Sequence, residues 1–350
     1  MQTNGRHKSS VLGRWWGGLW RTPLPNVGCE ISQDGISIAR WSRRSGSLDT
    51  AAWKPIPAGA IEASPLRENI HQPEEVQRAF GDALSALGIP PPAASRAASS
   101  RKMTEAVLVI PDQAARLFVL NFEKFPDKTS EGLPLVKWRL KKSLPFDLES
   151  AAISFFVQRS GADLQVVAVA SPQWIVRQYE AVAQQFGLRP RWVILSSLAS
   201  LGLAGGFAGD EADSPRPAGD SDGAAGVLMA KYSPPWFTTA ILQGGALRLF
   251  RTVALPAGED GLVSPADVLG SVYPSIAYFQ DNFQGSVALA YLCGLGENSV
   301  PIAAALEQEL HLRARPLFAD LDSIVASVDP QRAERHFAAL LGIVREQQIG

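Results

Sequence analysis

Residues 227–255 read VLMAKYSPPWFTTAILQGGALRLFRTVAL, and this stretch predicts three consecutive β-strands. The strands are expected at 227–232, 236–242 and 246–255, because apolar, β-branched and aromatic residues dominate each of them. Gln243-Gly244-Gly245 separates the last two strands, and paired glycines of this kind are typical of a tight hairpin turn. The stretch therefore predicts an antiparallel β-meander.

A helix is expected directly after this meander. Ser264 precedes Pro265, and Asp267 lies three residues after the serine, a combination typical of a helix N-terminus. Apolar residues then recur with helical spacing up to Phe283. The rest of the chain predicts a strand at 287–293, a helix at 302–310, a strand at 313–317 and a terminal helix around Phe337. The second half thus has the order βββαβαβα.

The first half repeats this order. Strands are expected at 27–31, 35–41, 48–56, 106–110 and 192–195. Helices are expected at 74–87 and 173–186, and a short helix is expected to follow the last strand and end at Leu203. One additional block, residues 112–171, interrupts the series. It predicts a strand at 117–122, a helix at 130–143 and strands at 153–158 and 164–170.

Two βββαβαβα halves indicate an α/β protein with the duplicated actin-like (ribonuclease H-like) fold. We expect the first half at 26–111 and 172–204, the inserted block at 112–171 and the second half at 226–350. Residues 205–225 are expected to be a disordered linker, because Phe207 is their one large apolar residue. Pro90–Ser100 is expected to be a shorter mobile loop.

The composition excludes several function classes. The chain has 350 residues, 19% of them charged, and a formal net charge of −1, which argues against a general nucleic-acid binder. Two cysteines cannot make a disulfide framework or a four-thiolate zinc site. No P-loop is present, and the four histidines lack metal-ligand spacing. Cys29 lies on a predicted core strand, where a buried apolar role is expected rather than a nucleophilic one.

Residues 1–25 form a basic, tryptophan-rich segment with no acidic residue. Trp15, Trp16 and Trp20 lie among its arginines and lysine. One interpretation is a flexible tail whose aromatic side chains pack on the body of the protein. The other is a peripheral contact with a membrane or a membrane partner, because tryptophan and basic residues both favour the lipid headgroup region.

Several stretches resemble the PilM branch of the FtsA-like actin superfamily, the cytoplasmic component of type IV pilus machines. They are the strand pair within 27–40, Ile110-Pro111-Asp112, residues 136–146 with their Leu144-Pro145-Phe146 turn, residues 186–190 and residues 337–345. The resemblance implies that the inserted block is a 1C (SHS2-like) subdomain and that the halves form subdomains 1A and 2A. Only about eight residues separate the third strand of the second half from its helix. A 2B subdomain is therefore expected to be missing or minimal.

The resemblance also implies the place of a nucleotide site, and the sequence departs from what such a site needs. The candidate residues are Glu30, Ser32, Asp34 and Gly35 in the first half and Gly294 and Gly296 in the second. Residues 228–235 have no carboxylate and no glycine, and two prolines remove backbone donors. We therefore expect a degenerate site and no ATP hydrolysis, with no required cofactor and doubtful binding of ATP and Mg²⁺.

A partner is implied as well, because PilM-like proteins bind the N-terminal tail of the membrane protein PilN between 1A and 1C. The groove is expected along Pro111–Leu120 and the inserted helix, with Arg116, Phe118, Lys137, Trp138 and Lys141 as candidate contacts. The basic run from Lys137 to Lys142 has two interpretations. It is either a solvated helix face or a surface for an acidic peptide or an anionic membrane.

The leading hypothesis is a non-catalytic, cytoplasmic adaptor, peripheral to an inner membrane, that holds a PilN-like tail in a pilus or secretion assembly. The alternatives are a nucleotide-binding switch with a degenerate ATP site and a scaffold like the cytoplasmic domain of GspL.

Overall fold

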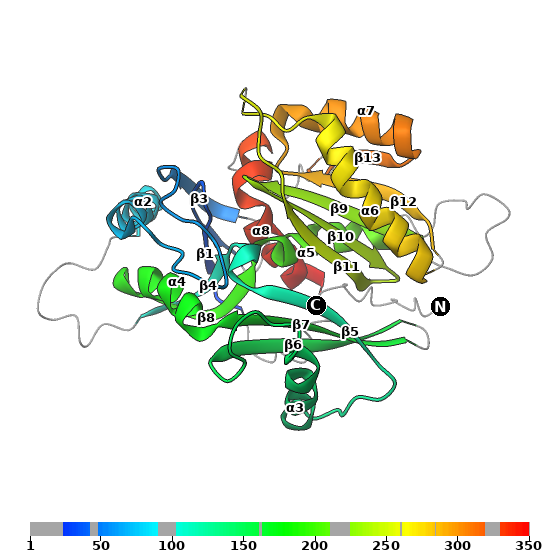
Figure 1. Ribbon diagram of the computed structural model, residues 1–350. Coiled ribbons are helices and arrows are strands. Elements are labelled where there is room, and N and C mark those ends of the chain that lie inside the picture. The colour runs from blue at the N-terminus through cyan, green and yellow to red at the C-terminus, as the bar shows by residue number, and fades with distance from the viewer. Residues whose placement is uncertain are drawn as a thin grey trace, which may run out of the picture.

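The computed structural model describes residues 24–42, 48–89, 103–160, 163–210, 225–259, 261–283, 285–318 and 330–349. Within these residues the chain forms two five-stranded sheets and one three-stranded sheet (Figure 1). The tryptophan-rich segment up to residue 23 and the expected loop at 90–100 lie outside the described residues.

The first sheet has the strand order β3-β2-β1-β4-β8. Its strands are β1 (Val27–Ile31), β2 (Gly35–Trp41), β3 (Leu48–Pro55), β4 (Thr104–Ile110) and β8 (Leu188–Leu195). The first three strands are antiparallel, and β4 and β8 run parallel to β1. The helices of this half are α2 (Pro73–Ala86), α4 (Gln173–Gln185) and α5 (Ser196–Asp210).

The second sheet repeats this arrangement in the order β11-β10-β9-β12-β13. Its strands are β9 (Gly226–Ser233), β10 (Trp236–Gln243), β11 (Ala246–Ala254), β12 (Val287–Cys293) and β13 (Arg313–Pro316). Its helices are α6 (Pro265–Phe283), α7 (Ser299–Leu310) and α8 (Pro330–Ile349). The predicted duplication of a βββαβαβα unit is confirmed by the matching strand orders.

The hairpin turn predicted within the meander and the helix N-terminus predicted after it are also present in the structure. Gly244 and Gly245 have φ angles of 58° and 78°, which the hairpin requires and which other residues rarely adopt. Ser264 accepts a hydrogen bond from the backbone N–H of Asp267 at 3.1 Å and so caps α6. Residues 255–264 join β11 to α6, and those described among them form neither helix nor strand.

Two expectations differ from the structure. Strand β8 begins at Leu188 rather than at Trp192, and it passes Pro190 with a register shift opposite Ala106 and Val107. Helix α5 continues to Asp210, into the segment expected to be a disordered linker from 205. The glycine- and alanine-rich composition of this segment is a poor guide to whether it is helical, because α5 as a whole is stabilised by packing against α8.

The inserted block forms a sheet of order β5-β7-β6 with one helix on it. Its elements are β5 (Arg116–Phe122), α3 (Thr129–Leu140), β6 (Ala151–Ser160) and β7 (Asp163–Pro172). Successive side chains of each strand point to opposite faces of the inserted sheet. Phe118 and Val166 pack with α3, whereas Val119 and Val167 join the core of the first half. Helix α3 therefore lies on the outer face, directed away from the rest of the molecule (Figure 1).

Helices α5 and α8 cross between the two halves and join their cores. One cluster of buried apolar side chains runs from the first sheet through Leu201 and Leu340 to Met229 and Tyr291 of the second sheet. Gly342 allows the close crossing, because a Cβ atom there would lie 2.1 Å from the carbonyl oxygen of Ala199. No helix in the described part of the chain is long and apolar enough to cross a membrane.

The substitution Gly342→Ala is expected to lower the free energy of unfolding by about 2–3 kcal/mol, because α5 and α8 must separate to accept the methyl group. Gly270→Ala is the matched control, since this helical glycine of α6 has no neighbour within 4 Å of an added Cβ. The control is expected to be neutral or to stabilise by up to about 1 kcal/mol. Urea denaturation measures both, and equal effects would contradict the close crossing.

Candidate functional site

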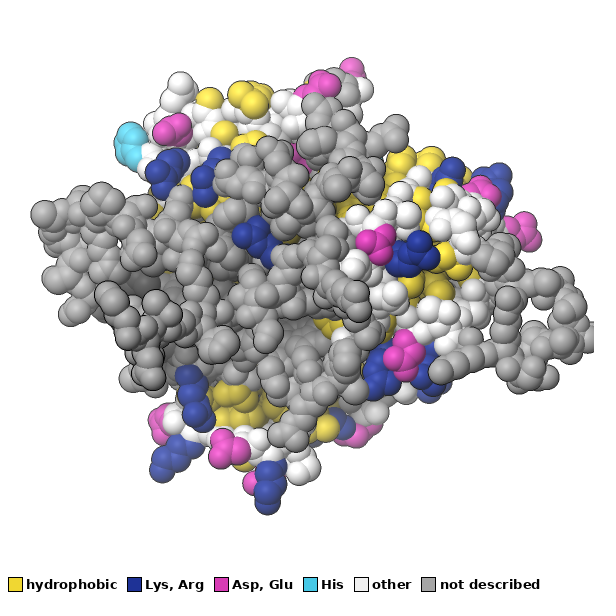
Figure 2. Space-filling model, turned by 180° about the vertical axis from the view of Figure 1, so that it is seen from behind, with side chains coloured by type: hydrophobic (Ala, Val, Ile, Leu, Met, Phe, Trp, Pro, Cys, Tyr) yellow, Lys and Arg dark blue, Asp and Glu magenta, His cyan; other side chains and the backbone are white. Residues whose placement is uncertain are grey.

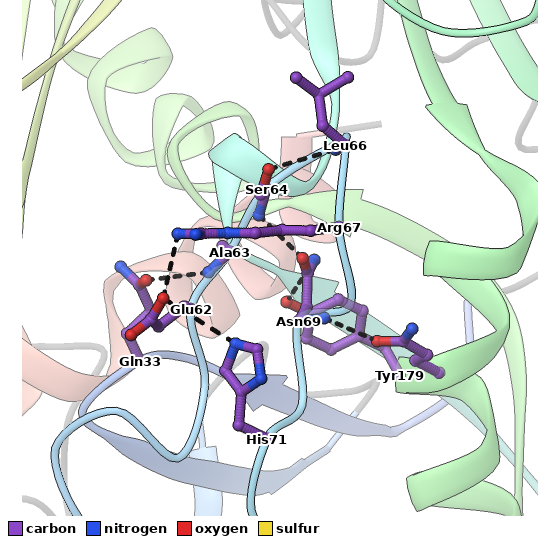
Figure 3. Close-up of polar contacts among 10 residues, drawn as sticks. Gln33, Glu62, Ala63, Ser64, Leu66, Arg67, Asn69, His71 and Tyr179 are labelled. Carbon is purple, nitrogen blue, oxygen red and sulfur yellow. Dashed lines mark hydrogen bonds and ion pairs between the residues drawn. The ribbon is translucent and has the colours of Figure 1, made fainter.

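The centre of the molecule is the cleft where the β1–β2 turn of the first half faces the β9–β10 turn of the second. Gln33 joins the two turns, because its Nε2 donates to the carbonyl oxygen of Pro234 at 3.4 Å. Its Oε1 accepts a hydrogen bond from the backbone N–H of Ala63 at 3.0 Å (Figure 3). The turns that the resemblance assigns to phosphate binding are therefore bonded to each other through one side chain.

Ala63 belongs to an ordered loop between β3 and α2, which a set of polar contacts holds in place (Figure 3). Asn69 is its anchor. The Asn69 Oδ1 accepts from the Ser64 N–H at 2.9 Å, and the Nδ2 donates to the hydroxyl of Tyr179 on α4 at 3.2 Å. The loop in turn positions the Ala63 N–H that holds Gln33.

The polar groups of the β1–β2 turn are already used within the turn. Ser32 Oγ lies 2.6 Å from Asp34 Oδ1 and accepts a hydrogen bond from the N–H of Gly35 at 3.2 Å. Gly35 cannot carry a side chain, since a Cβ atom would lie 2.4 Å from Nε1 of Trp53. The hydroxyl of Ser32 and the N–H of Gly35, two residues of the expected nucleotide site, thus bond to each other.

Below the turns, a buried network crosses the cleft. Lys231 of β9 donates from Nζ to the hydroxyls of Ser196, at 2.5 Å, and Ser200, at 3.0 Å. Ser196 donates to Glu30 Oε1. All four side chains are buried. Burial raises the pKa of Glu30, and the nearby Lys231 ammonium partly opposes this rise.

Lys231 gives the cleft its own cation. A magnesium site needs several oxygen ligands around an open position. Here the carboxylate of Glu30 is bonded to Ser196 and faces an ammonium group. The described residues contain no group of three or more His, Cys, Asp or Glu side chains that could hold a metal ion. A second cation at this point would be repelled, so the residues present do not fit Mg²⁺.

The remaining space does not fit a nucleotide. Glu30, Ser32, Asp34 and Lys231 line a common cavity of about 40 Å³. That volume holds roughly three water molecules, whereas sites for drug-sized ligands are typically about 300–1,000 Å³. The structure therefore brings the predicted residues of the first half together, but around a space that is too small.

The second predicted turn is filled in a similar way. Gly294 and Gly296 do not line this cavity. The carboxyl group of Glu334, on α8, is largely buried beside the backbone N–H groups of Gly294 and Leu295, which partly oppose the rise that burial causes in its pKa. Gly294 has a φ of 75°, and a Cβ atom there would lie 2.2 Å from the carbonyl oxygen of Tyr232. The glycine turn thus faces a buried carboxyl group of the chain itself.

Two further contacts hold the halves together. Asp112 caps α5 by accepting from the Ser197 N–H at 2.9 Å, and it also accepts from the Thr238 hydroxyl of β10 at 3.1 Å. The side-chain amide of Gln158, in the inserted block, makes a two-point contact with the backbone of Leu247 on β11. Its Nε2 donates to the Leu247 carbonyl oxygen at 2.6 Å, and its Oε1 accepts from the Leu247 N–H at 3.0 Å. Both contacts tie the first half to the second sheet.

Sequence reasoning missed the partners that fill the cleft. Lys231 was visible as a cation inside an apolar strand, a pattern that calls for a buried partner. Gln33 and Glu334 carry no such signal, because their roles depend on which elements the fold brings together.

A different hollow lies between the inserted block and the first half. It has a volume of about 210 Å³ and a mainly apolar lining. Its walls include Ala152 and Phe156 of β6, Val176 of α4, and Trp192 and Val193 of β8. Within the described residues, β6 pairs only with β7 and β8 only with β4, so each contributes an edge strand. We call this hollow the edge-strand groove.

The predicted partner residues do not line this groove. Phe118 packs under α3, and Arg116 lies beside a separate hollow near Trp236. The α3 residues Lys137, Trp138 and Lys141 are on the opposite side of the inserted sheet from the first half. Strand alternation explains this placement, since one face of a sheet cannot pack on both α3 and the first half.

Comparison with known proteins agrees with this architecture. No protein-family profile and no curated protein matches the sequence. A chain of the solved PilM–PilN type IV pilus biogenesis complex has a TM-score of 0.68 at 17% identity, over 92% of this chain and 98% of that one. At this identity the likeness shows the fold.

The chain has a PilM-like, actin-like fold. The cytoplasmic domain of EpsL, an inner-membrane component of the type II secretion system of Vibrio cholerae, has a TM-score of 0.42 at 12% identity, over 76% of this chain and 81% of its own. A Bacteroides thetaiotaomicron protein with an actin-like ATPase fold and unknown function has a TM-score of 0.48 at 11% identity, over 82% and 89%. With TM-scores this low, neither supports a conclusion about this chain.

Substitution of Lys231 tests the buried network. Lys231→Met is expected to lower the free energy of unfolding by about 3 kcal/mol, because it leaves Ser196 and Glu30 without the ammonium. Adding Glu30→Gln is expected to restore about 1–2 kcal/mol, since the neutral amide needs no cation. Lys142→Met, in the turn after α3, is the exposed control, with an expected change within about 0.5 kcal/mol. Strictly additive effects in the Lys231 and Glu30 pair would show that the two groups are uncoupled.

Glu334 makes stability depend on pH. Burial raises its pKa from 4.5 to about 7 in the folded chain, so folding takes up a proton. The stability gained from this proton is fully present below about pH 4.5 and is lost as the pH rises to about 7. Glu334→Gln cannot lose a proton. Between about pH 5 and pH 8, the wild type is expected to lose roughly 2 kcal/mol more than the variant, measured by urea denaturation. Parallel pH profiles would contradict the shifted pKa.

Proposed function

We propose that the chain is a non-catalytic adaptor of a type IV pilus or related secretion assembly, and that it binds the N-terminal tail of a PilN-like membrane protein. The observation that carries the proposal is the combination of a closed, self-filled cleft with an open edge-strand groove. The similar solved structure is a PilM–PilN complex. On this proposal the adaptor works at the cytoplasmic face of an inner membrane.

The edge-strand groove suits an extended peptide. The edges of β6 and β8 offer backbone N–H and C=O groups to a strand lying between them. Val176 and Phe156 supply an apolar lining that would take alternate side chains of such a strand. Backbone bonds would then provide affinity, and the apolar lining would select apolar residues of the tail.

A nucleotide-binding switch is the poorer proposal for this geometry. Lys231 is bonded to Ser196 inside the cleft, and Gln33 bonds the two turns. A switch would also have to part the apolar core that α5 and α8 share between the halves. These contacts support an adaptor whose cleft stays closed without a ligand.

Pull-down with a peptide of the PilN-like tail tests the proposal. Val176→Glu and Ala152→Arg, both at accessible positions of the edge-strand groove, are expected to reduce binding at least tenfold, because each places a charge in an apolar site. The double variant Lys137→Glu with Lys141→Glu is expected to bind like the wild type, because α3 lies on the other face of the inserted sheet. Circular dichroism of each variant controls for folding.

Two outcomes would contradict the proposal. Failure of the wild type to bind the tail would remove the adaptor role. Loss of binding in the α3 double variant, with full binding in the groove variants, would move the site to α3.

A further inference from the structure

The outward face of α3 carries an exposed aromatic side chain that the proposed tail site does not use. Trp138 is 71% exposed, and Leu135, one turn earlier, is 40% exposed. Val136 and Leu140 are fully buried against the inserted sheet, so Trp138 lies on the side of the helix opposite to them. Large apolar side chains left in water in this way are typical of a contact surface.

Basic residues surround this tryptophan. No acidic residue occurs between Glu131 and Asp147, whereas Lys137, Arg139, Lys141 and Lys142 fall in that interval. Lys137 is 3.5 Å from Glu149, and Arg139 lies over the ring of Phe122 at 5.7 Å. Among the described residues, neither Lys141 nor Lys142 has an ion-pair partner. Helix-end cations are favoured by the helix dipole, but this does not explain an exposed tryptophan beside them.

The shape of the surface indicates what it contacts. Helix α3 forms the outer end of the molecule, on the far side of the inserted sheet (Figure 1). Basic and acidic side chains both project from this lower end, with apolar side chains visible between them (Figure 2). A convex helix face offers no groove for a peptide, but it can rest on a flat surface. Tryptophan and lysine are the residues that the headgroup region of an anionic bilayer favours.

We propose that the α3 face, made of Leu135 and Trp138 of α3 with Lys141 and Lys142 of the turn that follows the helix, rests on a bilayer that contains anionic phospholipid. The tryptophan ring enters the headgroup region, and the two lysines pair with lipid phosphates. This contact goes beyond the proposed tail binding and uses the opposite side of the inserted block. One such contact is weak and reversible, so stable attachment requires a second signal from the same molecule or its partner.

Vesicle co-sedimentation of the full chain tests the contact. The two probes are vesicles of phosphatidylcholine and vesicles in which about one third of the lipid is phosphatidylglycerol. The wild type is expected to bind the second kind, and raised salt is expected to weaken binding. Lys141→Glu with Lys142→Glu, and separately Trp138→Ala, are expected to reduce binding about tenfold or more. Trp174→Ala is the matched control, since Trp174 is a second exposed tryptophan, 43% exposed, that belongs to α4 rather than to α3.

Three results would overturn the proposal. The first is a wild type that does not prefer the anionic vesicles, as expected if the surface meets an acidic protein. The second is wild-type binding by both α3 variants, as expected if residues 1–25 alone contact lipid. The third is an equal loss in Trp174→Ala and Trp138→Ala. The α3 variants should retain tail binding, and Val176→Glu should retain vesicle binding, so failure of this contact is distinct from failure of the adaptor role.

Discussion

A buried lysine ammonium at the meeting point of the two halves is the constraint on which the rest of the structure depends. Lys231 extends from the second sheet and is held by Ser196 and Ser200 of the first half. A buried cation is costly unless it is fully hydrogen-bonded and faces an opposite charge. Opening the cleft would remove both partners at once. The ammonium therefore favours a closed arrangement without any ligand.

The other contacts across the cleft follow from this closed arrangement. Gln33 reaches Pro234, and Asp112 reaches Thr238, only because the turns lie so close. The two-point contact of Gln158 with Leu247 fixes the inserted block to the second sheet. Because the inserted block is held in this way, the edge-strand groove and the α3 face keep fixed positions on the molecule. The edge-strand groove lies on the side of the first half, and the α3 face lies on the opposite side.

The architecture could be predicted from the sequence, whereas the side-chain contacts that fill the cleft could not. Strand alternation and helical spacing depend on neighbours in the chain, so the duplicated order, the Gly244-Gly245 turn and the Ser264 cap could all be predicted. The filled cleft depends on pairs far apart in the chain, such as Glu30 with Ser196 and Glu334 with Gly294. The place of the predicted partner residues also depends on packing between distant parts of the chain. The basic pattern of α3 identified a surface, but only the packing of the inserted sheet shows which side of the block it occupies.

We propose that the chain fills its own actin-like cleft and functions without nucleotide. Calorimetric titration of Mg-ATP into the wild-type chain, with both at sub-millimolar concentration, tests it most directly. The account predicts no heat beyond that of dilution. Saturable binding at those concentrations, reduced by substitution of Glu30 or Asp34, would contradict it.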